Sequence, residues 1–200
     1  MISNYKKKKF EIIIFSILLL LPIFIDSYYL DNISYFMCWT FISLGLAVIW
    51  GMGGILSFGQ TAFFGLAGYG FSVISINFLG IAGVSIWSVV LSLIITGIFG
   101  MIVGYFLFYG GIYDVFIGIV TLAITLVLET FMQQTAGPEY AIGSARLNGF
   151  NGMQGMPTIG FESLQFGLLE GITQYYFILL LAIVILISLY KYKQSKIGLI

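Results

Sequence analysis

The chain has no histidine, a single cysteine (Cys38) and few charged residues. Without histidine, neither a Ser-His or Cys-His nucleophile pair nor a His-ligated metal site can form within the chain. One cysteine gives no intrachain disulfide and no CxxC metal or redox motif. No stretch matches GxxxxGK(S/T), the sequence of a Walker A nucleotide site. The usual parts of an enzyme are therefore missing, and we expect a protein that is not an enzyme and that holds no cofactor or metal.

The composition is that of a membrane protein. Charged residues make up 8% of the sequence and hydrophobic residues 60%, whereas about a quarter of the residues of a soluble domain are charged. The mean hydropathy is +1.08. Residues 32–113 contain no charged residue and no histidine. Since one spanning helix needs about 20 apolar residues, this tract holds several spans. We expect an all-α, polytopic bundle of transmembrane helices.

The few positive charges lie near the two ends of the sequence. Lys6 to Lys9 precede the first apolar run, Lys191, Lys193 and Lys196 follow the last, and only Arg146 lies between them. The positive-inside rule then predicts that both termini are cytoplasmic, with an even number of spans in the cell (inner) membrane. Lysines at span ends give no indication of nucleic-acid binding. The N-terminus resembles a signal peptide, but the bulky residues after Asp26 predict an uncleaved first span.

Six spans fit the hydrophobic pattern and the charge rule. They are predicted at residues 11–30, 33–51, 59–79, 84–108, 112–135 and 174–190. Asp26 and Asp31 are expected in the first outer turn. The stretch from Gly137 to Thr173 forms the one substantial outer loop, rich in glycine and carrying Glu139, Glu162 and Glu170. Such a loop either gates a pathway, meets a partner or is a passive surface loop.

A glycine-rich tract joins the second and third predicted spans. Eight glycines lie between Gly45 and Gly70. One interpretation is a tight cytoplasmic turn with close helix packing, to which Gly65 and Gly68 would contribute. The other is unwound backbone at membrane depth, which is tolerated where it is buried or lines a cavity. In that case small polar side chains line a pathway, and the candidates are Ser57, Gln60 and Thr61.

The fifth predicted span carries polar and small residues at steps of three and four, which places them on one helix face. These residues are Asp114, Gly118, Thr121, Thr125, Glu129 and Gln133. A carboxylate within a span is costly and is expected to face the bundle interior or water. Thr121, Thr125 and Glu129 are therefore further candidates for lining a pathway. Alternatively, Asp114 and Glu129 mark the two membrane interfaces and the threonines bond to their own helix.

The fourth predicted span has a helical face made of Gly97, Gly100 and Gly104. This face includes a GxxxG step, the pattern of closely packed membrane helices. We assign these glycines to helix packing and give them no role in transport.

Three segments resemble the membrane subunits of branched-chain amino acid ABC importers, the LivM-like permeases. Residues 56–69, LSFGQTAFFGLAGY, are similar to the family's LSxG(H/Q)xAFFGxGAY block. Residues 111–113 with 120–123 resemble its GxYxxxxTLA helix, and residues 148–157, NGFNGMQGMP, resemble its TGGxNGxxGIP loop. The resemblance spans about residues 44 to 160, and the remaining predicted spans agree with it in character.

The resemblance implies a permease subunit of an ABC importer for branched-chain or other hydrophobic amino acids. The implied partners are membrane lipid, two cytoplasmic ATPase subunits that bind the ATP, a second permease subunit, an extracytoplasmic substrate-binding protein and the small-molecule amino-acid substrate. Relatives that import urea or short amides give an alternative substrate class. A structural membrane subunit without transport, or a passive channel, is an alternative of another class.

The end of the chain also bears on this interpretation. The family continues into a cytoplasmic segment that docks on the ATPase, and Ser195 to Ile200 resemble only its opening residues. We therefore expect residues 1–200 to form a single transmembrane permease domain, truncated before the ATPase-coupling segment.

Overall fold

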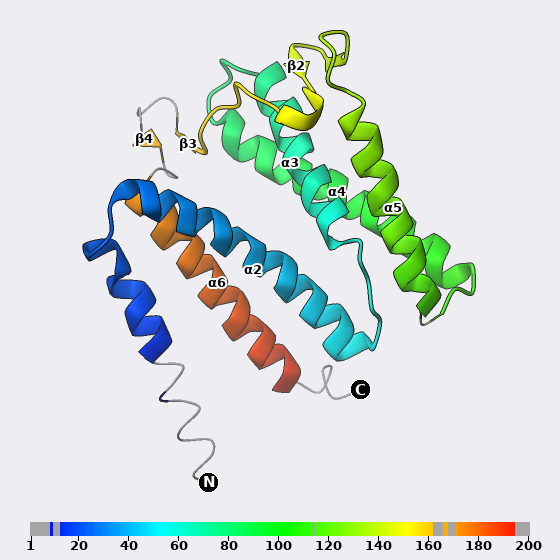
Figure 1. Cartoon of the computed structure of the whole chain (residues 1–200), viewed down its shortest axis with the longest axis horizontal. Helices are drawn as coiled ribbons and strands as arrows, with labels where there is room; N and C mark the ends of the chain where they lie inside the picture. Colours follow the sequence, from blue (N-terminus) through cyan, green and yellow to red (C-terminus); the bar gives the residue numbers. More distant parts are fainter. Residues whose placement is uncertain (1–8, 10–12, 114, 162–165, 168–170, 195–200) are drawn as a thin grey trace.

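A computed structural model describes residues 9, 13–113, 115–161, 166, 167 and 171–194. The predicted all-α class is confirmed, because nearly all regular structure is helical (Figure 1). Several residues discussed above lie outside the described residues. These are Lys6 to Lys8, Asp114, Glu162, Glu170 and Ser195 to Ile200.

The described chain starts with an apolar helix over Ile13–Ile23, whose last turn is the 3-10 helix η1 (Leu21–Ile23). Five longer helices follow: α2 (Ser27–Gly53), α3 (Gln60–Asn77), α4 (Val84–Tyr109), α5 (Val115–Gln133) and α6 (Gly171–Gln194). Between α5 and α6 lie the 3-10 helix η2 (Gly149–Asn151) and two short antiparallel pairs. In these, β1 (Ala141–Ile142) pairs with β2 (Ala145–Arg146), and β3 (Gly160–Phe161) pairs with β4 (Phe166–Gly167).

Four of these helices are long and apolar enough to cross a membrane. They are α2, α4, α5 and the Gly171–Tyr192 part of α6. The chain is therefore a multi-pass membrane protein. The helix over Ile13–Ile23 is shorter, and α3 is not among the four. The count of six spans stays a prediction.

The predicted boundary after the first span is wrong. A span over residues 11–30 was expected, but the helix ends at Ile23 and α2 begins at Ser27. Pro22 lies at this end, and proline removes a backbone hydrogen bond and clashes with the preceding turn. Asp31 therefore lies one turn into α2, with its side chain exposed, and is not in a turn.

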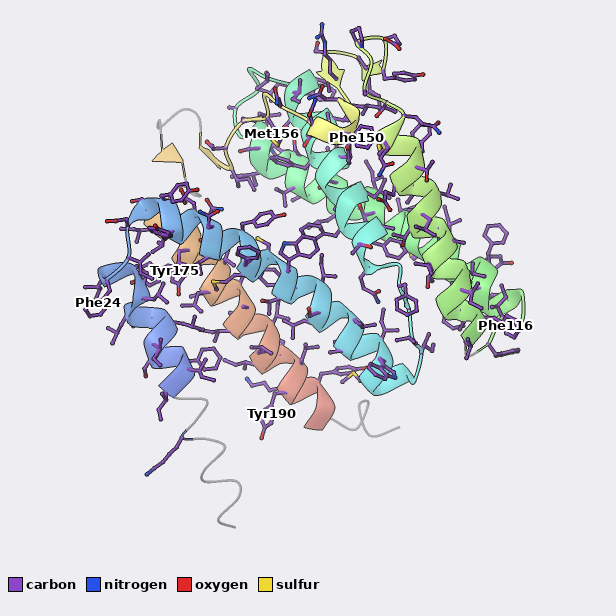
Figure 2. All side chains as sticks on the ribbon, in the orientation of Figure 1. Phe24, Phe116, Phe150, Met156, Tyr175 and Tyr190 are labelled. Carbon is purple, nitrogen blue, oxygen red and sulfur yellow. The ribbon has the colours of Figure 1, made fainter. Side chains whose placement is uncertain are left out.

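The helices form two groups, which Figure 1 shows side by side. In the first group α2 packs along α6, around the buried side chains of Leu30, Tyr175 and Leu179. Tyr175 also reaches the N-terminal helix, where its hydroxyl donates a hydrogen bond of 2.6 Å to the Leu18 carbonyl oxygen (Figure 2). One tyrosine thus joins all three helices of this group.

The second group contains α3, α4 and α5, and α3 packs most extensively on α4. Small residues let these two helices approach closely, as is usual in membranes. A Cβ atom added to Gly70 would lie 3.2 Å from the Cβ atom of Ser92. Ser75, Ser85 and Ser88 are fully buried nearby on the two helices. Serines and Gly70, rather than a row of glycines, form this part of the interface.

Of the five glycines predicted to pack, Gly100 alone lies against a neighbouring helix among the described residues. A Cβ atom on Gly65, Gly68 or Gly97 would meet no other atom within 4 Å, so none of the three is at a close helix contact among the described residues. One on Gly100 would meet Phe63 at 3.7 Å, and one on Gly104 only Phe108 of its own helix at 4.0 Å. The reason is that α3 meets α4 through the face of Gly70. A packing role for the other glycines stays a prediction.

Candidate translocation pathway

The glycine-rich tract contains a break between two helices. The helix α2 ends at Gly53, and residues 54–59 follow without helical structure before α3 begins at Gln60. Gly54 has φ +65°, a left-handed conformation that suits glycine, and its N–H donates to the Trp50 carbonyl oxygen at 3.0 Å. We call residues 54–59 the linker.

Two threonines of α5 hold the linker. The Phe58 N–H donates to the Thr121 hydroxyl oxygen at 3.0 Å, and the Thr125 hydroxyl donates to the Phe58 carbonyl oxygen at 3.0 Å. The Gly59 N–H donates to the Ser57 hydroxyl oxygen at 3.2 Å. Three of the backbone groups freed by the break, the N–H and carbonyl of Phe58 and the N–H of Gly59, thus find a side chain, and such partners are what unwound backbone away from water needs.

The linker contacts α5 well inside that helix. A helix of 19 residues is about 28 Å long, and Thr121 and Thr125 lie about 9 and 15 Å along it from Val115. Phe58 therefore lies close to halfway along α5. This geometry favours unwound backbone within the bundle over a turn at the end of two spans.

A cavity of about 390 Å³ lies between α3 and α5, on the outer-loop side of Phe58. Three predicted pathway residues line it: Thr61, Thr125 and Glu129. The remaining lining residues are Ala62, Gly65, Leu66, Tyr69, Leu128, Met132, Gln133, Gly149 and Phe150. The Gln133 side-chain amide donates to a Glu129 carboxylate oxygen at 3.1 Å.

The other three predicted residues do not line this cavity. Ser57 and Thr121 are buried and hold the linker, as described above. Gln60 points toward α2, where its Cγ atom would be 3.9 Å from a Cβ atom on Gly45. Its amide nitrogen is buried without a hydrogen-bond partner among the described residues.

A second cavity, of about 230 Å³, lies on the opposite side of Phe58. It is lined by Gly54, Leu56, Phe58, Val115, Gly118, Ile119 and Leu122, and thus by the first two turns of α5 and the linker. The two cavities follow α5 in succession, the first with polar side chains and the second with almost none. The linker segment around Phe58 lies between them.

The outer loop is fixed over the first cavity by two residues that sequence reasoning missed. Asn77, at the end of α3, donates to the Ile142 carbonyl oxygen at 2.7 Å and accepts from the Ser144 N–H at 2.8 Å. The Ser85 hydroxyl donates to the Gly160 carbonyl oxygen at 2.9 Å. In the sequence, Asn77 is only an amide near the end of an apolar stretch. The loop is thus held at residues 142–144 and at Gly160, and Phe150 lies between these points (Figure 2) and lines the cavity.

The sequence matches a family model described as branched-chain amino acid transport system / permease component, over residues 28–200. The chain belongs to this family. No curated protein and no solved structure gave a match. The linker, both cavities and the outer loop all lie within the matched residues. The helix over Ile13–Ile23 precedes them.

Proposed function

We propose that this chain is the membrane-spanning permease subunit of an ABC importer for branched-chain or other hydrophobic amino acids. Separate ATPase subunits would power it, a second permease subunit would share the pathway, and an extracytoplasmic binding protein would deliver the substrate. The family membership supports the class of protein, and the site described above supports a pathway along α3 and α5.

The observation that carries the proposal is the linker halfway along α5, with a cavity on each side. Transporters commonly place substrate sites near the bilayer midplane at discontinuous helices. In this proposal Thr61, Thr125 and Glu129 line the outer cavity, and Ser57 and Thr121 hold the barrier formed around Phe58. Gln60, next to the break, would line the pathway when the barrier moves. Opening the barrier would connect the polar outer cavity to the apolar inner one.

The arrangement of the helices supports the proposed orientation in the cell membrane. The N-terminal helix begins and α6 ends on one side of the bundle, while the β1–β2 pair lies on the other side (Figure 1). Lys9 precedes the first of these helices, and Lys191 lies near the end of α6. With lysines on the inside, both ends of the chain face the cytoplasm and the outer loop faces outward.

The test is co-expression of the subunit, including the ATPase-coupling segment that the family resemblance predicts after residue 200, with a candidate ATPase that carries a Walker A motif. We expect co-purification in detergent, ATP turnover by the complex, and ATP-dependent uptake of labelled leucine into proteoliposomes with the binding protein present. A chain that retains no ATPase would be a structural subunit. Uptake that needs no ATP would indicate a passive channel. ATP-driven uptake of urea or acetamide but not of leucine would replace the proposed substrate class.

A further inference from the structure

The outer cavity contains one acidic side chain and no basic one. Glu129 is the only charged residue among those that line it. The side chain of Glu129 is exposed to the cavity, and the one hydrogen bond to its carboxylate among the described residues comes from Gln133, one turn further along α5. A carboxylate accepts about four hydrogen bonds, so most of its capacity is unused among the described residues.

The position of Glu129 makes this charge significant. It lies about 21 Å along α5 from Val115 and about 6 Å before the end of the helix at Gln133. Gly149 and Phe150 of the outer loop lie over the same cavity. Ionisable residues within membrane helices are costly and are generally paired with an opposite charge. Among the described residues, no basic side chain pairs with Glu129. We therefore look to the transported molecule for the positive charge.

The other walls suit an ammonium group on an aliphatic molecule. Tyr69 and Phe150 are among the lining residues, and aromatic faces attract cations. Ala62, Leu66, Leu128 and Met132 supply apolar surface for an aliphatic side chain. The volume of about 390 Å³ falls within the range of small-molecule pockets, roughly 300–1,000 Å³.

We propose that the outer cavity selects for a protonated amine on the transported molecule, and that Glu129 is the specificity-determining residue. This inference rests on the proposed function and deepens it. An amino acid carries such an ammonium group, whereas urea and short amides do not. The negative charge of Glu129 would therefore favour amino acids over urea and short amides, the two substrate classes that the family resemblance leaves open.

The experiment compares two probes with the same aliphatic tail, isopentylamine as the cation and 4-methylpentanamide as the neutral analogue. Binding is measured by saturation-transfer NMR on the full chain in lipid nanodiscs. The external binding protein is left out, because its own selectivity would mask that of the cavity. We expect the wild-type chain to prefer the amine by about 10- to 100-fold, the usual contribution of a charged hydrogen bond.

Glu129→Gln is expected to abolish this preference, since the amide keeps the shape and polarity of the side chain without its charge. The matched control is Glu139→Gln, which removes a carboxylate of the outer loop that does not line the cavity and is expected to leave the preference intact. Phe150→Leu keeps apolar surface without a ring, and is expected to weaken amine binding by about 2- to 30-fold.

Three results would overturn the inference. They are no amine binding to the wild type, equal binding of the two probes, or a preference that survives Glu129→Gln in a chain that elutes as the wild type does in size-exclusion chromatography. These results leave the proposed function standing if the ATPase co-purifies and leucine uptake needs ATP. Conversely, a chain that retains no ATPase contradicts the proposed function, while the binding comparison still decides the role of Glu129.

Discussion

Thr121→Val tests whether the α5 threonines hold the linker. Valine has nearly the shape of threonine, so the substitution mainly removes the hydroxyl oxygen that accepts from the Phe58 N–H at 3.0 Å. That N–H would then have no partner. Leaving a buried donor unpaired costs about 1–3 kcal/mol, while hydrogen bonds between membrane helices average about 0.6 and reach about 1.7 kcal/mol. We therefore expect the native linker to lose about 1–2 kcal/mol, a factor of about 5–30 in its population.

The assay is hydrogen–deuterium exchange of the chain in lipid nanodiscs, followed by mass spectrometry of the peptide that covers residues 54–60. Exchange in this peptide should accelerate about 5–30-fold in Thr121→Val, and Thr121→Ser, which keeps the hydroxyl, should restore protection. Thr130→Val makes the same chemical change at an exposed position of α5 and should have no effect on the peptide. Unchanged exchange in Thr121→Val, or equal acceleration in the Thr130 control, would refute the reasoning.

Three further predictions address the topology and the packing. In a chain in which Cys38 is replaced by serine, a cysteine introduced at Phe150 should react with a membrane-impermeant thiol reagent added outside. Labelling only from the cytoplasmic side would contradict the proposed orientation. Gly70→Val should destabilise the chain in a thermal unfolding assay by about 1–3 kcal/mol through overpacking against α4. Gly97→Val should not, because a Cβ atom there meets nothing within 4 Å. Equal effects of the two substitutions would argue against the α3–α4 interface described above. Asn77→Ala, which removes both bonds to the outer loop, should speed limited proteolysis in that loop several-fold, and an unchanged rate would show that other contacts hold it.

The helices could be predicted best where a long apolar run ends at glycines. A span over residues 84–108 was expected and α4 covers Val84–Tyr109, with Gly83 and Gly110 at its two ends. The prediction was wrong around Pro22, because hydropathy does not register a missing backbone N–H, and the apolar run continues past the proline.

The candidate site could be predicted only in part. Periodicity placed Thr125 and Glu129 on one face of a helix, and both line the outer cavity. The partners of that face were not predictable, because Phe58 is 63 residues from Thr121 and 67 from Thr125 in the sequence. The faces at which the helices pack were hard to predict for a related reason. Serine is as compatible with close approach as glycine, and the sequence alone does not tell which face of α3 meets α4.

The pairing of α2 with α6 has a consequence for how the protein is made. The partner of α2 begins at Gly171, 118 positions after Gly53, where α2 ends. At a synthesis rate of about 5–20 residues per second, roughly 6–24 s pass after α2 is made before the ribosome begins the helix that covers Leu30. During that interval the surface around Leu30 and Ser34 faces lipid or an insertion factor rather than its native neighbour. Polar substitutions on this face of α2 are therefore expected to affect early biogenesis as well as the stability of the finished bundle.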